Sequence, residues 1–66
     1  MNKIILNGEV TVTAAASIIK LLQELELPLS TVLVEQNGVA LHRHELEKAL
    51  LAEGDKIEIL KVVAGG

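Results

Sequence analysis

The chain has 66 residues, half of them hydrophobic, and carries nine acidic against six basic side chains, a formal net charge of −3 at pH 7. It contains no Cys, Phe, Tyr or Trp. This length provides one small domain with one core and too little chain for a deep, walled cleft, which argues against a self-sufficient enzyme.

The same composition limits the classes of binding partner and the cellular compartment that we expect. Without cysteine there are no disulfides, thiolate nucleophiles or cysteine-based zinc sites, which fits a reducing cytoplasm. An acidic chain with neither a basic stripe nor aromatic rings is poorly suited to nucleic acid. No apolar run is long enough to span a membrane, and the first residues lack a signal-peptide layout. We therefore expect a cytoplasmic protein that binds protein partners, with no nucleic acid and no membrane.

The start of the chain predicts a β-hairpin. Residues 2–7 and 9–13 are rich in β-formers and meet at Asn7-Gly8. Asn and Gly both tolerate the positive φ of a type I′ turn, so this dipeptide is a strong hairpin signal.

A helix is predicted next, from Ser17 to Leu27, because the apolar residues change to a helical period. Its apolar face is formed by Ile18, Leu21, Leu22 and Leu25. Ser17 is a suitable N-cap, with Thr13 as the alternative if the three alanines are already helical. Pro28 ends the helix.

The second half of the chain returns to strand patterns. We expect a strand at 32–35, a turn at Asn37-Gly38, a short strand at 39–41, a short helix or 3₁₀ turn at 44–51, a turn at 53–55 and a last strand at 56–63. This order predicts an α+β roll: a mixed sheet of four to five strands with one main helix packed on one face. If the last strand lies beside the first, the fold is the β-grasp of ubiquitin-like proteins.

The last strand also suggests a contact surface. Ile57 and Ile59 share one face of the strand, while Leu60 and Val62 lie on the other with Glu58. If the helix covers the first face, Leu60 and Val62 are exposed. Ile5 and Leu33 are candidates to join them in a partner interface; the alternative is scattered surface aliphatics.

The chain ends on Gly65-Gly66, which packing does not explain. We expect a β-grasp domain at 1–63 and a flexible tail at 64–66. Without side chains, such a tail can enter a narrow channel and bring the Gly66 carboxylate close to a phosphate. Attachment of AMP would turn that carboxylate into an electrophile, and the ATP would be bound by another protein.

Several segments together resemble the ThiS family, the sulfur carriers of thiamine biosynthesis. They are Asn7, "VEQNG" at 34–38, "LHR" at 41–43, "EGDKIEIL" at 53–60 and "VVAGG" at 62–66. The resemblance covers nearly the whole chain and rests on the ordered set. One position differs: Leu46 stands where the family usually has an aromatic residue, a change that keeps the position apolar.

The resemblance implies a function centred on Gly66. A ThiF-type adenylyltransferase would use ATP to adenylate Gly66, and a sulfur-donor protein would supply the sulfur that converts it to a thiocarboxylate. A thiazole synthase of the ThiG type would then take this sulfur. Ala64, Gly65 and Gly66 would form the tail that enters both active sites. The chain would be a co-substrate with no catalytic residues, no stably bound cofactor and no metal.

Other functions stay open at this stage. One is the small subunit of molybdopterin synthase, whose family tends to be longer and often has proline where this chain has Lys61. The others are a ubiquitin-like modifier joined to lysines through Gly66, and a small binding module with an inert tail. His42 and His44 lack an obvious third ligand for a metal, and Gly54-Asp55 is best explained as a turn in which Asp55 caps the backbone.

Overall fold

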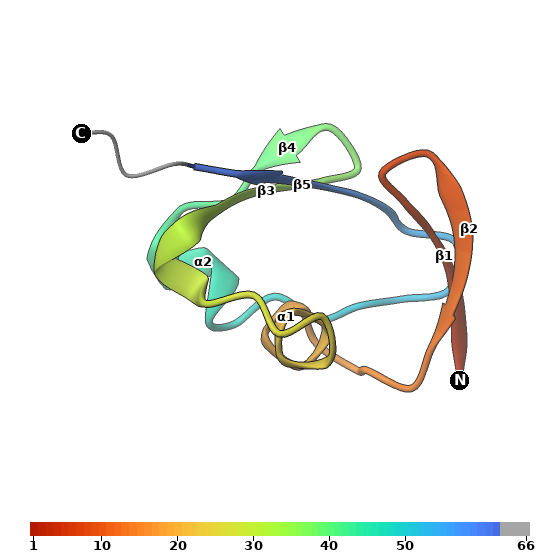
Figure 1. Ribbon diagram of the computed structural model, residues 1–66. Helices are drawn as coiled ribbons and strands as arrows, with labels where there is room; N and C mark the ends of the chain where they lie inside the picture. Colours follow the sequence, from red (N-terminus) through yellow and green to blue (C-terminus); the bar gives the residue numbers. More distant parts are fainter. Residues whose placement is uncertain (63–66) are drawn as a thin grey trace.

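The structure is a computed structural model, and it describes residues 1–62. Its five strands form one sheet in the order β2-β1-β5-β3-β4, with α1 packed across one face (Figure 1). The elements are β1 (Asn2–Leu6), β2 (Glu9–Thr13), α1 (Ile18–Glu24), η1 (Leu29–Thr31), β3 (Val32–Gln36), β4 (Val39–Ala40), α2 (Arg43–Leu46) and β5 (Lys56–Lys61). The predicted α+β roll with a β-grasp arrangement is confirmed.

The hairpin of β1 and β2 forms as predicted, with Leu6 directly opposite Glu9. Asn7 has a φ of 48° and Gly8 a φ of 84°, so both central residues adopt the positive φ that a type I′ turn needs. The first strand ends at Leu6, one residue earlier than predicted, because Asn7 already belongs to the turn.

Helix α1 begins where Ser17 caps it, since the Ser17 hydroxyl accepts a hydrogen bond from Lys20 N at 3.2 Å. The alternative cap, Thr13, has another role: its hydroxyl donates to Glu24 Oε1 at 2.6 Å. The helix ends at Glu24, three residues earlier than predicted, because Glu26 has a φ of 57° and breaks the helical path before Pro28 is reached.

The second half of the chain follows the predicted order with shorter helices. Strand β3 and the Asn37-Gly38 turn are confirmed, but α2 is a single turn that ends at Leu46, whereas the prediction extended to residue 51. The short 3₁₀ helix η1 was not predicted. Strand β5 ends at Lys61; residue 63, which the prediction included, lies outside the described residues.

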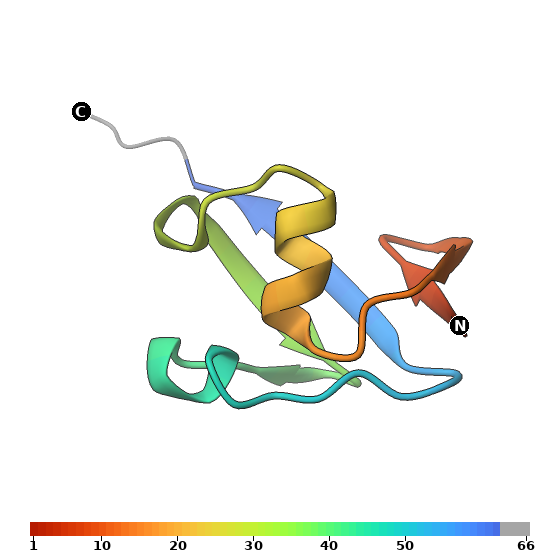
Figure 2. The same cartoon turned by 90° about the horizontal axis from the view of Figure 1, so that it is seen from below.

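The core lies between α1 and the sheet. Strand β5 runs parallel to β1 on one side and antiparallel to β3 on the other. Figure 2 shows α1 lying across β3 and β5. Among the described residues, ten hydrophobic side chains are buried: Ile4, Ala15, Ile18, Leu21, Leu22, Val32, Val34, Leu46, Leu51 and Ile57. Leu25, the fourth residue of the predicted helix face, is 39% exposed because it lies beyond the last helical residue as the C-cap. Across residues 1–62, the structure has no helix with the length and hydrophobicity needed to cross a membrane.

Candidate functional site

The candidate site is the sheet face that α1 leaves uncovered, at the end of β5. Side chains alternate along a strand, and here Ile57 is fully buried whereas Leu60 is 65% exposed. The predicted division of β5 into a core face and an open face is therefore confirmed.

Three of the four predicted interface residues gather at one end of this face. Leu33 on β3 lies directly opposite Leu60 on β5, and Leu33 is 60% exposed. Val62, which is 45% exposed, lines a neighbouring hollow together with Leu33 and Arg43. The backbone N–H of Val62 donates to the carbonyl of Thr31 at 2.8 Å, so β3 and the residue before it hold this end of the chain in place.

The fourth residue, Ile5, does not lie beside them. It is paired with Lys56 on β5 and with Val10 on β2. Lys56 precedes Leu60 by four residues, so the two rows are about 13 Å apart along the strand. The sequence pattern places Ile5 on the open face of the sheet, as predicted. Only the register between β1 and β5 shows that it lies beside the start of β5, whereas Leu60 lies near the end of that strand.

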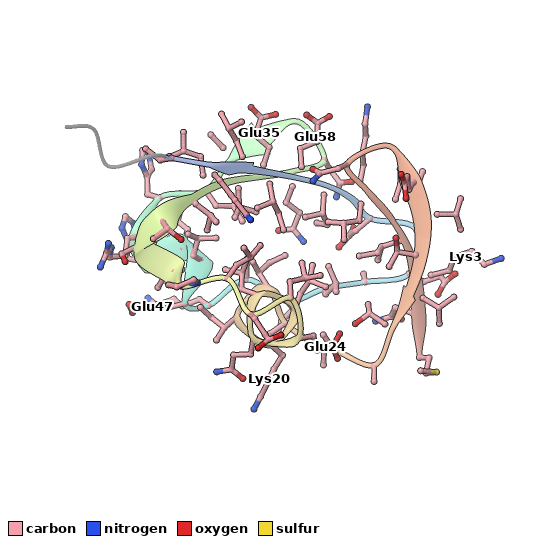
Figure 3. All side chains as sticks on the ribbon, in the orientation of Figure 1. Lys3, Lys20, Glu24, Glu35, Glu47 and Glu58 are labelled. Atoms are coloured by element: carbon pink, nitrogen blue, oxygen red, sulfur yellow. The ribbon has the colours of Figure 1, made fainter. Side chains whose placement is uncertain are left out.

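Two carboxylates separate these rows. Glu35 on β3 lies directly opposite Glu58 on β5, and Figure 3 shows both side chains pointing away from α1. With Leu33 and Leu60 they line a groove of about 260 Å³, completed by Asn7 and Ile59. This groove, named here the outer-face groove, is partly apolar and partly acidic.

The two Asn-Gly turns hold β5 from opposite edges. Asn7 Oδ1 accepts a hydrogen bond from Ile59 N at 2.8 Å, and Asn37 Oδ1 accepts one from Lys56 N at 2.9 Å. The sequence indicated only turns at these positions. A side chain that also receives a hydrogen bond from a distant strand has no local signal, so this second role was missed.

Asp55 joins three segments next to the start of β5. Its carboxylate accepts hydrogen bonds from Ala52 N at 2.8 Å, Gln36 Nε2 at 2.9 Å and Asn37 Nδ2 at 3.0 Å. Partial burial acts to raise the pKa of Asp55, but these hydrogen bonds outweigh it, so the pKa is lowered from 3.8. The predicted backbone cap is confirmed, and the Gln36 and Asn37 contacts extend it.

The predicted tail residues Ala64, Gly65 and Gly66 lie outside the described residues. Four residues, 63–66, follow Val62 in the sequence. Four residues of fully extended chain span at most about 14 Å, and this is the upper limit that the sequence sets between Val62 and Gly66. A protein that acts on Gly66 must therefore come close to the end of β5.

Two other parts of the molecule carry side chains that could take part in chemistry, and the first is a pair of histidines. The rings of His42 and His44 are stacked with centroids 6.1 Å apart. Nowhere in residues 1–62 do three or more His, Asp or Glu side chains form a group that could hold a metal.

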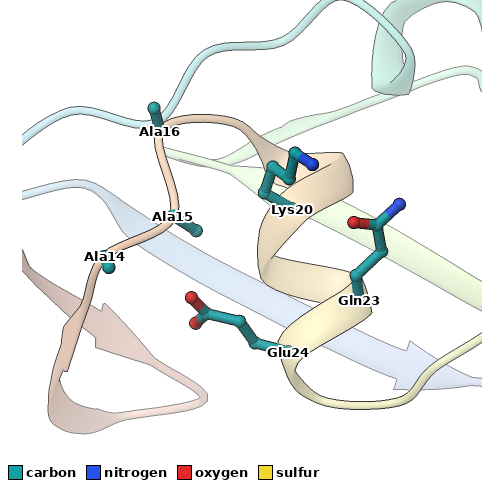
Figure 4. A pocket seen from close by; sticks show the side chains of 6 residues that line it. All are labelled: Ala14, Ala15, Ala16, Lys20, Gln23 and Glu24. Atoms are coloured by element: carbon teal, nitrogen blue, oxygen red, sulfur yellow. The ribbon is translucent and has the colours of Figure 1, made fainter.

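A wider hollow of about 500 Å³ lies between residues 14–16 and α1. In Figure 4 the side chains of Lys20, Gln23 and Glu24 border it beside three alanines. The Glu24 carboxylate is already bonded to Thr13. A lone lysine beside methyl groups and an engaged carboxylate does not form a nucleophile–base pair.

Comparisons with known proteins find similar folds and a matching sequence family. No curated protein sequence matches the chain significantly. A crystal structure of a thiamine biosynthesis protein (ThiS) from Geobacter metallireducens matches with a TM-score of 0.80 and 28% identity, covering 97% of this chain and 99% of that one. A solution structure of a thiamine biosynthesis protein from the same organism matches with a TM-score of 0.78 and 28% identity, covering 97% and 87%. The model of the ThiS family matches residues 4–66, nearly the whole sequence. This chain therefore belongs to the ThiS family.

Proposed function

We propose that this protein is a sulfur carrier of thiamine biosynthesis and that Gly66 carries the sulfur. The observation that supports this most directly is the family match, which extends through Gly66 itself. The protein is then a co-substrate that partner enzymes modify, and its fold serves to present the end of the chain.

The chemistry follows from the reactivity of a carboxylate, which is a poor electrophile. The Gly66 carboxylate would attack the α-phosphate of ATP and release pyrophosphate, forming an acyl adenylate. A sulfur nucleophile at the oxidation level of sulfide, supplied by a donor protein, would then displace AMP and leave a thiocarboxylate. That sulfur would pass to the precursor of the thiazole ring in exchange for an oxygen atom from the precursor or from water, which regenerates the Gly66 carboxylate for another cycle.

We assign the steps to separate partners. A ThiF-type adenylyltransferase binds the ATP, and a thiazole synthase of the ThiG type accepts the sulfur. Residues 1–63 would form the domain, and Ala64, Gly65 and Gly66 the flexible tail that enters each active site. We place these reactions in the cytoplasm, in keeping with a cysteine-free chain.

The proposed docking surface is formed by Leu33, Leu60 and Val62 at the end of β5. Their exposure and their position next to the tail support this assignment. Ile5, which lies about 13 Å away along the strand, is left out of it.

The function is tested by measuring the intact mass of the protein after incubation with ATP, a ThiF-type enzyme and a sulfur source. We expect the gain of one adenylyl group, followed by the replacement of one oxygen by sulfur. A variant that lacks Gly66 is the control: it should keep the far-ultraviolet circular dichroism of the parent and show neither change.

An unchanged mass would contradict the proposal if the same enzyme preparation modifies its own carrier. Adducts joined through Gly66 to lysines of other proteins would instead identify a protein modifier. Normal partner binding and normal thiazole formation by the variant without Gly66 would identify a binding module with an inert tail.

A further inference from the structure

The outer-face groove combines two cross-strand pairs of opposite character. Leu33 lies opposite Leu60, and in the neighbouring row Glu35 lies opposite Glu58. All four are exposed, and they line the same hollow of about 260 Å³. An apolar contact and a double negative charge are thus presented side by side.

The acidic pair is unfavourable for the isolated fold. Directly opposite residues in an antiparallel pair have Cβ atoms about 4.5–5.5 Å apart, and like charges there are destabilising. None of the six residues that line the groove is basic. Lys56 lies on the same face in the adjacent row, two residues before Glu58, but it does not line the groove. One lysine beside two carboxylates leaves this part of the surface with a net negative charge.

We propose, on the basis of the proposed function, that the adenylating partner docks on the outer-face groove and that its contact residue is an arginine bound by both Glu35 and Glu58. A guanidinium has five N–H donors in a planar fork, so one group can serve two carboxylates. An apolar side chain of the partner packs on Leu33 and Leu60. The arginine would relieve the like-charge repulsion between the two carboxylates in the complex.

The position of the groove supports this occupant. The enzyme must reach Gly66, which follows Val62 by four residues in the sequence, a stretch that can span at most about 14 Å. Leu60 is two residues before Val62 and lines the groove. An enzyme that acts on Gly66 therefore has to approach the surface that carries Glu35 and Glu58.

The test compares Glu35→Gln/Glu58→Gln with the matched control Glu26→Gln/Glu47→Gln. Each double variant removes two negative charges, and all four glutamates are exposed. Figure 3 shows Glu47 beside α2, away from Glu35 and Glu58. The readouts are pyrophosphate release by a ThiF-type enzyme over a range of salt concentrations, and urea unfolding of each variant alone.

We expect the groove variant to lose about tenfold in kcat/KM, mainly through a higher KM, because charge-assisted hydrogen bonds to the partner are removed. Its rate should also depend less on salt, while its stability equals or exceeds that of the parent. The control should stay within about twofold of the parent, as exposed charges contribute little.

An unchanged kcat/KM in the groove variant would overturn the inference while leaving the proposed function intact. A loss of rate that accompanies a loss of stability would also overturn it, because the pair would then have a structural role. If the parent protein itself is not adenylated, the proposed function fails, and this inference fails with it.

Discussion

Asp55 shows how one partly buried carboxylate can fix the geometry of a small domain. Its three hydrogen bonds join the turn at residues 52–55 to the end of β3 and to the turn after it. Asn37 in turn accepts from Lys56 N, so the same cluster sets where β5 begins. The position of the proposed site at the other end of β5 depends on this start.

Stability should depend on the ionisation of Asp55. Its pKa is lower in the folded protein than the unfolded value near 3.8, so folding favours the carboxylate. This contribution is fully present above the unfolded pKa and is lost as the pH falls below about 4 through the folded pKa. In Asp55→Asn, an amide NH₂ replaces one of the carboxylate oxygens that accept hydrogen bonds from N–H groups. We expect this variant to lower the free energy of unfolding by on the order of 1 kcal/mol at pH 7 and to make that free energy less dependent on acid.

The measurement is urea unfolding followed by circular dichroism between pH 7 and pH 3. The exposed Glu9→Gln serves as a control for the loss of one charge. If Asp55→Asn keeps the full acid dependence of the parent, another carboxylate is responsible for it.

At the scale of elements, β5 is positioned by side chains as well as by its neighbouring strands. Only two residue pairs join β1 to β5 in parallel, Ile5 with Lys56 and Leu6 with Ile57. Asn7 continues this contact: its N–H donates to the carbonyl of Ile57, and its Oδ1 accepts from Ile59 N. The turn residue thus replaces a third pair of strand residues.

Asn7→Gly should therefore loosen one edge of β5 while leaving the turn intact, since glycine accepts the positive φ. We expect a loss of about 1 kcal/mol for the hydrogen bond. Amide hydrogen exchange gives the local readout: the Ile59 amide should exchange faster, and the Lys56 amide, held by Asn37, should not. Equal acceleration of both amides would indicate a general loss of stability instead.

Local patterns predicted most of these elements, and long-range contacts account for what they missed. The two Asn-Gly turns, the Ser17 cap and the alternation along β5 each depend on neighbouring residues. The early end of α1 depends on a positive φ at Glu26, which no pattern indicates. The displacement of Ile5 from Leu60 and the pairing of Glu35 with Glu58 depend on strand register, which joins residues more than 20 apart in sequence.

At the scale of the whole molecule, one set of aliphatic residues serves two purposes. With no aromatic side chain, Ile, Leu and Val provide both the core and the exposed surface of the candidate site. Ile57 and Leu60 lie on the same strand, one at 0% and the other at 65% exposure. Folding and docking should therefore be separable by substitutions three residues apart.

We expect Ile57→Val to destabilise the protein by about 1 kcal/mol through loss of a buried methylene, which lowers Tm by about 4–8 °C in a domain of this size. Its kcat/KM for adenylation below that Tm should match the parent, because the groove and the tail are unchanged.

Leu60→Ala should do the reverse: Tm should change little, since the side chain is mostly in solvent, while kcat/KM falls because the partner loses an apolar contact. Thermal unfolding followed by circular dichroism gives the Tm of each variant, and pyrophosphate release gives its kcat/KM. Loss of rate in Ile57→Val at a temperature where it is fully folded would show that the partner senses the core, and an unchanged rate in Leu60→Ala would remove Leu60 from the docking surface.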